Sequence, residues 1–144
     1  MERLMERRIN GILESALYFP DLGGSCEFYQ DLFGFEVLLS SERLVALSVA
    51  GKQVLLLFQE EGSLNEIQLP TGGTIPAHDG KGPVHIAFSI DRDSQQFWKE
   101  RLSSRNINIE SEVSFNEGYS LYFRDTNGHL VELATPGIWK GIEG

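Results

Sequence analysis

The sequence contains a single cysteine, Cys26, so no disulfide bond can form within the chain. A protein without disulfides is typical of a reducing compartment. Positive charge is also scarce, because 12 lysines and arginines stand against 21 aspartates and glutamates, which gives a formal net charge of −9. This balance argues against nucleic acid or an anionic membrane as a partner.

Long apolar runs are missing as well. The longest run, VLLLF at 54–58, is far too short to span a bilayer. The segment MERLMERRIN is charged from residue 2 onward and has no apolar stretch of signal-peptide length. We therefore expect a soluble, cytoplasmic protein, and 144 residues fit one globular domain.

One order of segments is written twice along the chain. After a polar arm or short helix at 1–10, the first copy covers 11–59, and the second copy covers 82–136 before a tail at 137–144. Residues 60–81, rich in glycine and acids, predict a connector that can act as a lid.

Each copy predicts a strand, a helix and three further strands. In the first copy we expect strands at 12–19, 35–40, 44–49 and 53–59, and a helix capped by Asp21 and ended by Gly34. In the second copy we expect strands at 84–90, 107–114, 119–124 and 129–134, and a helix that starts at Asp93 or Ser94 and ends near Ser104. The prediction is an α+β fold of two βαβββ modules, each of which must pair with a copy to bury its sheet.

Strand alternation places three ionisable residues on faces lined by small or mixed side chains, as a ligand cavity requires. These faces hold Glu14 with Ala16 and Tyr18, His85 with Ala87 and Ser89, and Glu132 with Leu130 and Ala134. Glu14 and His85 occupy equivalent places in the two modules, so pairing the modules should bring them together.

Two carboxylates and one imidazole in a partly apolar cleft are costly without a cation. A divalent metal held by Glu14, His85 and Glu132 supplies that cation and keeps positions open for water and substrate. Each residue also has a simpler explanation. A backbone carbonyl or a water could satisfy His85, Glu14 could face solvent on an edge strand, and Glu132 could pair with an arginine or lysine.

Other polar residues are candidates for catalysis. Tyr122 shares a face with Ser120 and, through the hairpin that DTNG implies, with Glu132, so its phenol could protonate a metal-bound oxyanion. The alternative is a half-buried tyrosine bonded to water. His78, on the connector, is either a second acid–base group or a surface-loop histidine. Cys26 fits the buried stripe of the first helix better than a nucleophile.

Three segments resemble the vicinal oxygen chelate superfamily of glyoxalases, bleomycin-resistance proteins and extradiol dioxygenases. They are ILESALYFPDLGGSCEFYQDLFGFEV, GPVHIAFSI and SLYFRDTNGHLVELATP, and the resemblance covers residues 11–136. It implies paired βαβββ modules that form a U-shaped sheet around a metal, with Glu14, His85 and Glu132 as ligands. It also implies a homodimer.

The chain departs from the family pattern at several positions. Leu55 or Leu56 falls where glyoxalase I has a fourth ligand, and Gln59 comes several residues late. Glu14 replaces a histidine, which favours hard ions. Ser120 and Tyr122 fall where fosfomycin-resistance enzymes place substrate-binding hydroxyls. Glu112 stands where those enzymes have a lysine, which argues against a phosphonate substrate.

We therefore expect a metal-dependent enzyme that binds one divalent ion per chain, Fe, Mn, Zn or Mg, and acts on a small oxygen-rich molecule. It would be a lyase, an isomerase, a transferase or an extradiol dioxygenase. The alternatives are a metal-free protein that sequesters a drug or ligand, as bleomycin-resistance proteins do, and a metal-bearing sensor without turnover.

Overall fold

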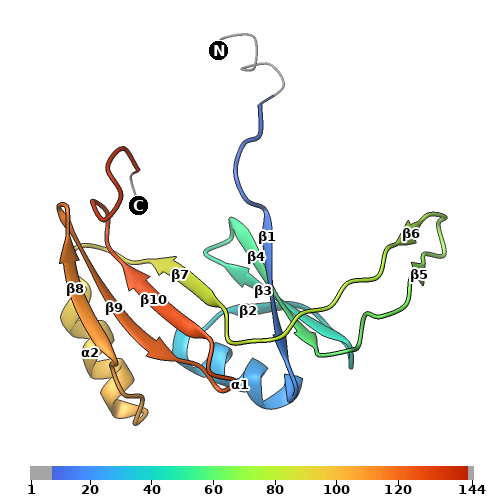
Figure 1. Cartoon of the computed structure of the whole chain (residues 1–144), viewed down its shortest axis with the longest axis horizontal. Helices are drawn as coiled ribbons and strands as arrows, with labels where there is room; N and C mark the ends of the chain where they lie inside the picture. Colours follow the sequence, from blue (N-terminus) through green and yellow to red (C-terminus); the bar gives the residue numbers. More distant parts are fainter. Residues whose placement is uncertain (1–7, 143–144) are drawn as a thin grey trace.

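The computed structural model describes residues 8–142, and its elements follow the predicted order (Figure 1). The first module contains β1 (Glu14–Phe19), α1 (Leu22–Phe33), β2 (Glu36–Ser40), β3 (Leu44–Val49) and β4 (Gln53–Gln59). The second contains β7 (His85–Ser89), α2 (Gln95–Ser104), β8 (Ser111–Phe115), β9 (Gly118–Arg124) and β10 (Leu130–Ala134). Between them, the connector forms a short hairpin that we did not predict, β5 (Ile67–Gln68) and β6 (Thr74–Ile75).

The two modules share one topology. Their sheets have the orders β1-β4-β3-β2 and β7-β10-β9-β8. In each, the first strand pairs in parallel with the last one, and the remaining pairs are antiparallel. This repetition confirms the predicted α+β fold of two βαβββ modules.

The strand predicted at 107–114 begins only at Ser111. Ile107 and Ile109 pack against the core, so their alternation reflects burial rather than pairing in the sheet. Residues 12 and 13 likewise precede β1, although the carbonyl of Leu13 accepts a hydrogen bond from Val54 N (2.8 Å). The predictions for residues 1–7 and 143–144 lie outside the described part of the chain.

Local signals fix the ends of α1 as predicted. The Asp21 carboxylate accepts a hydrogen bond from Gly24 N (3.1 Å), which satisfies one of the free N–H groups of the first turn. Gly34 ends the helix with a φ of 71°, a left-handed conformation that glycine adopts without strain. Ser94 precedes α2, and its hydroxyl donates to the Asp91 carbonyl (2.7 Å) instead of capping the helix.

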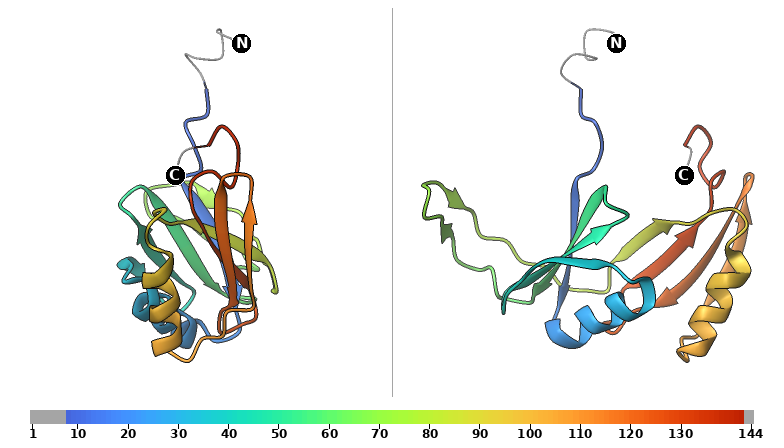
Figure 2. Two further views of the ribbon diagram at one scale, coloured as in Figure 1. Left: turned by 90° about the vertical axis from the view of Figure 1, so that its left-hand side faces the viewer. Right: turned by 180° about the vertical axis from the view of Figure 1, so that it is seen from behind.

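One hydrophobic core joins the modules. It contains side chains from both helices and from the inner faces of both sheets, including the fully buried Phe19, Tyr29, Leu102, Phe123 and Leu133. Both helices lie on the same side of the two sheets, as the left view of Figure 2 shows. Among residues 8–142, no helix covers the other face of either sheet, and we call these two surfaces the open faces. No helix within residues 8–142 is long and apolar enough to cross a membrane.

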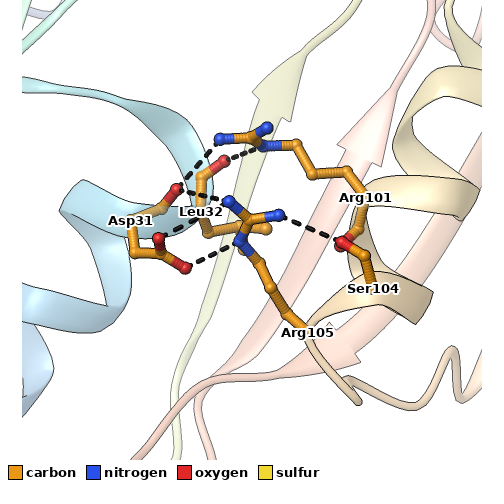
Figure 3. Close-up of polar contacts among 5 residues, drawn as sticks. All are labelled: Asp31, Leu32, Arg101, Ser104 and Arg105. Atoms are coloured by element: carbon orange, nitrogen blue, oxygen red, sulfur yellow. Dashed lines mark hydrogen bonds and ion pairs between the residues drawn. The ribbon is translucent and has the colours of Figure 1, made fainter.

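Arg101 of α2 and Arg105, the residue that follows α2, bind the carboxyl end of α1 (Figure 3). Arg101 donates from Nε to the Leu32 carbonyl (2.7 Å) and from Nη2 to the Asp31 carbonyl (3.0 Å). Arg105 Nε donates to the Asp31 carboxylate (2.7 Å). The last carbonyls of a helix have no partner within the helix, and α1 has no basic residue in its own last turn. The second module therefore supplies the charge that the first module lacks.

We expect Arg101→Met to lower the free energy of unfolding by about 2 kcal/mol, because two charge-assisted hydrogen bonds are lost, one of them to the partly buried Leu32 carbonyl. Arg92→Met is the matched control, since Arg92 makes one long, exposed hydrogen bond to the Glu117 carbonyl (3.3 Å). Urea denaturation measures both variants. Equal stabilities of the two variants would contradict a structural role for this contact.

Candidate functional site

His85 and Glu132 lie next to each other on the open face of the second sheet. They belong to the neighbouring parallel strands β7 and β10, and His85 Nε2 is 3.1 Å from Glu132 Oε1. The imidazole is half exposed, whereas Glu132 is only 9% exposed. A carboxylate this well covered needs partners for its charge.

The hydrogen bonds of His85 fix which ring nitrogen carries the proton. Nδ1 lies 3.0 Å from the carbonyl oxygen of Leu130, which can only accept, so Nδ1 carries the hydrogen. In the neutral ring, Nε2 then directs a lone pair at Glu132 Oε1. Two facing acceptors repel each other, and a positive charge between them, either a proton or a metal ion, removes that repulsion. A ring held by its second nitrogen in this way is typical of metal-binding histidines.

Ser120 and Tyr122, on β9, surround the same carboxylate. The buried Ser120 hydroxyl donates to Glu132 Oε2, which orients the carboxylate. Tyr122 is directly opposite Glu132 in the antiparallel register, with its ring centroid 6.3 Å from that of His85. Partial burial and the Glu132 carboxylate raise the pKa of Tyr122, so its phenol remains protonated at neutral pH and can donate a hydrogen bond.

Glu14 lies on the other open face. It is exposed at the start of β1, an edge strand, opposite Val54 of β4. Within residues 8–142 of a single chain, no three histidine, cysteine, aspartate or glutamate side chains are grouped closely enough to hold a metal. A single chain therefore does not bring Glu14 to His85, and the expectation that Glu14, His85 and Glu132 hold one metal ion stays a prediction. The two modules pack against each other through one shared core. Their open faces therefore do not lie over each other within one chain.

The position expected for a fourth ligand is apolar. In the parallel register Val54 is opposite Glu14 and Leu56 is opposite Ala16, so both lie on the open face. Leu55 is buried in the core. Gln59 has a structural role instead. Its amide donates to the Pro20 carbonyl (2.8 Å) and accepts from Leu22 N (3.4 Å), which holds the start of α1 against β4.

His78 packs on the open face of the first sheet, far along β1 from Glu14. Its Nδ1 is 2.6 Å from the hydroxyl of Tyr18, and its ring meets the edge of Phe58. Gly80 passes over the Tyr18 ring so closely that a Cβ there would fall 2.5 Å from it. Tyr18 is four residues from Glu14, about 13 Å in a strand. The connector is therefore anchored at this end, while its β5–β6 hairpin projects from the body (Figures 1 and 2).

His129 is a residue that the sequence analysis overlooked. It is fully buried, its Nδ1 accepts from Val84 N (3.0 Å) and its Nε2 lies 3.0 Å from the Tyr18 carbonyl, to which it donates. It thus ties β1 to the residue that precedes His85. The only sequence feature that could have indicated a buried role for His129 was its position between a tight turn and an apolar strand.

Two histidines should therefore show opposite tautomers. In the metal-free protein, at a pH where imidazoles are neutral, we expect His85 to carry its proton on Nδ1 and His129 to carry it on Nε2. Long-range ¹H–¹⁵N correlation spectra distinguish the two forms. A proton on Nε2 of His85 under these conditions would contradict the arrangement described above.

The paired modules and their open faces define a protein of the glyoxalase fold. The chain matches the model of the Glyoxalase/Bleomycin resistance protein/Dioxygenase superfamily over residues 9–133. It belongs to that superfamily, which confirms the resemblance noted in the sequence.

Similar proteins include a metallothiol transferase, a lyase and a resistance protein crystallised with a metal ion. Metallothiol transferase FosB of Bacillus licheniformis is 28% identical over 138 residues, which cover 94% of this chain and 82% of FosB. Lactoylglutathione lyase from Agrobacterium tumefaciens has a crystal structure with a TM-score of 0.82 and 33% identity, covering 92% of this chain and 98% of the lyase. The fosfomycin resistance protein FosX of Listeria monocytogenes, crystallised with Mn(II) and sulfate, has a TM-score of 0.64 and 25% identity, covering 88% of this chain and 90% of FosX.

Proposed function

We propose that the protein is a homodimeric enzyme that binds one divalent metal ion per chain. His85 and Glu132 of one chain and the partner's Glu14 would hold the ion. The observation that carries this proposal is the His85–Glu132 contact, in which the imidazole lone pair and a carboxylate oxygen face each other and could bind the same cation.

The open faces support a dimer. Each presents apolar side chains to solvent at its outer strand, where Leu39 of β2 is 59% exposed and Phe115 of β8 is 57% exposed. A two-fold axis that sets the open face of the first sheet on the partner's second sheet would cover both strands. It would also carry Glu14 towards the partner's His85 and form two equivalent sites.

The three side chains fit a divalent ion. Two carboxylates balance its charge, and with one imidazole they make a donor set suited to Mn²⁺, Fe²⁺, Zn²⁺ or Mg²⁺. A bound ion supplies a Lewis acid that can hold two vicinal oxygens of a substrate and stabilise an oxyanion or enolate. Ser120 would keep Glu132 oriented, and Tyr122 would present its phenolic proton to the substrate.

The chemistry that fits this site is a proton or group transfer at a carbon beside the chelated oxygens, in a lyase, isomerase or transferase. Ring-opening dioxygenation uses the same donor set and remains an alternative. The metal-free sequestering protein is not favoured, because the similar proteins named above include a metallothiol transferase and a resistance protein with bound Mn(II).

Metal content tests the ligand set. Protein purified without chelators should contain about one divalent ion per chain, and Glu14→Ala or Glu132→Ala should lose most of it. Glu27→Ala, an exposed glutamate on α1, is the control that should keep the ion. Full metal content in Glu132→Ala would refute the assignment.

Mixed dimers test whether the site is shared. A Glu14→Ala chain and a His85→Ala/Glu132→Ala chain should each bind little metal alone. Unfolded, mixed in equal amounts and refolded, they should regain about a quarter of the wild-type metal per chain, because half of the dimers then hold one intact site. If mixing restores no metal although size-exclusion chromatography detects dimers, the two chains do not share the site.

A further inference from the structure

We infer that this site selects uncharged or singly charged vicinal-oxygen ligands with an apolar body, and discriminates against phosphonates and phosphates. The inference rests on the proposed function, because it concerns what the metal site accepts. It follows from the side chains that surround the three ligand positions, from the charge of the donor set and from the engagement of the neighbouring arginines.

The strand registers identify the side chains next to each ligand position. Apart from Ser120, whose hydroxyl donates to Glu132, six side chains lie opposite a ligand position or two residues further along its strand; five of the six are apolar and three are alanines, which leaves room for a hydrocarbon body above the ion. They are Ala16 and Val54 beside Glu14, Ala87 and Leu130 beside His85, and Ala134 and Tyr122 beside Glu132. An apolar lining favours the part of a ligand that carries no charge.

The donor set leaves no net positive charge for an anion. A divalent ion with the carboxylates of Glu14 and Glu132 is neutral, whereas a site with only one carboxylate keeps a charge of about +1. A dianion would lose its hydration and lie beside two carboxylates in an apolar setting, which is unfavourable without a compensating cation. A ligand that gives up one proton on chelation avoids this cost.

Arg124 is on the same open face as Tyr122 and is opposite Leu130, and each of its three nitrogens already donates a hydrogen bond. Its Nε and Nη2 donate to the two carboxylate oxygens of Glu110 (3.0 and 3.1 Å), and Nη1 donates to the Gly128 carbonyl (3.1 Å). Arg124 lowers the pKa of Glu110, so the pair persists at neutral pH.

Arg43, at the first open face, is engaged in a similar way. Its Nη1 donates to the Ser63 hydroxyl (2.8 Å), and its guanidinium lies over the ring of Phe58 (5.6 Å). Glu112, where a fosfomycin-resistance enzyme has a lysine, is paired with Lys99 (2.6 Å) and Tyr119 (2.6 Å). In the register it is opposite the buried Leu121, away from the open face.

Calorimetric titration of the Mn²⁺-loaded dimer tests the preference. The probes are acetohydroxamate, a singly charged oxygen chelator, and methylphosphonate at a pH where it is a dianion. We expect acetohydroxamate to bind at least about tenfold more tightly. Equal or tighter binding of methylphosphonate would overturn the inference.

A pair of matched substitutions tests the cause. Glu110→Gln should free Arg124 and strengthen methylphosphonate binding by about tenfold, while acetohydroxamate binding stays the same. Glu112→Gln, the same change at a glutamate that is paired with Lys99 and Tyr119 instead of Arg124, should alter neither affinity. An unchanged methylphosphonate affinity in Glu110→Gln would refute the role given to the Arg124–Glu110 pair.

A preceding Mn²⁺ titration separates this inference from the proposed function. Failure of the wild-type protein to bind Mn²⁺ would overturn both. Normal Mn²⁺ binding together with a preference for methylphosphonate would overturn the substrate class alone.

Discussion

The constraint on which the structure depends is that each module has two sheet faces and only one helix to cover them. The helices and the inner faces form a single core, in which residues such as Phe19 and Phe123 are completely buried. The faces left uncovered carry Glu14 on one sheet and His85 with Glu132 on the other. Because no described helix covers the open faces, Leu39 and Phe115 are exposed there, and the polar residues on the same faces are accessible to ligands.

The sequence predicted what local rules determine. Strand period two placed His85, Glu132 and Tyr122 on one surface, and the DTNG turn set the register that brings the last two together. The sequence could not show whether Glu14 meets His85 and Glu132 of the same chain. Alternation along a strand tells which face Glu14 occupies, but not whether the opposing sheet belongs to the same chain or to a partner. The roles of Gln59 and His129 were also out of reach, since their partners are distant in sequence.

The relatives share this fold but catalyse different reactions, so the fold alone does not define the substrate. In the proposed site, two features of this chain bear on the substrate. A carboxylate at Glu14 in place of an imidazole removes one positive charge from the centre. The ion pair with Glu110 engages the guanidinium of Arg124, which lies on the same open face.

The contacts of Arg101 and Arg105 with the end of α1 also bear on how two reaction centres communicate. In the proposed dimer, each subunit would hold half of one centre on its first sheet and half of the other on its second. Because these contacts hold α1 against the end of α2, the two modules of a subunit move as one rigid body. A ligand that shifts the first sheet of a subunit also shifts its second sheet, so ligand binding at one site can change the affinity of the other site.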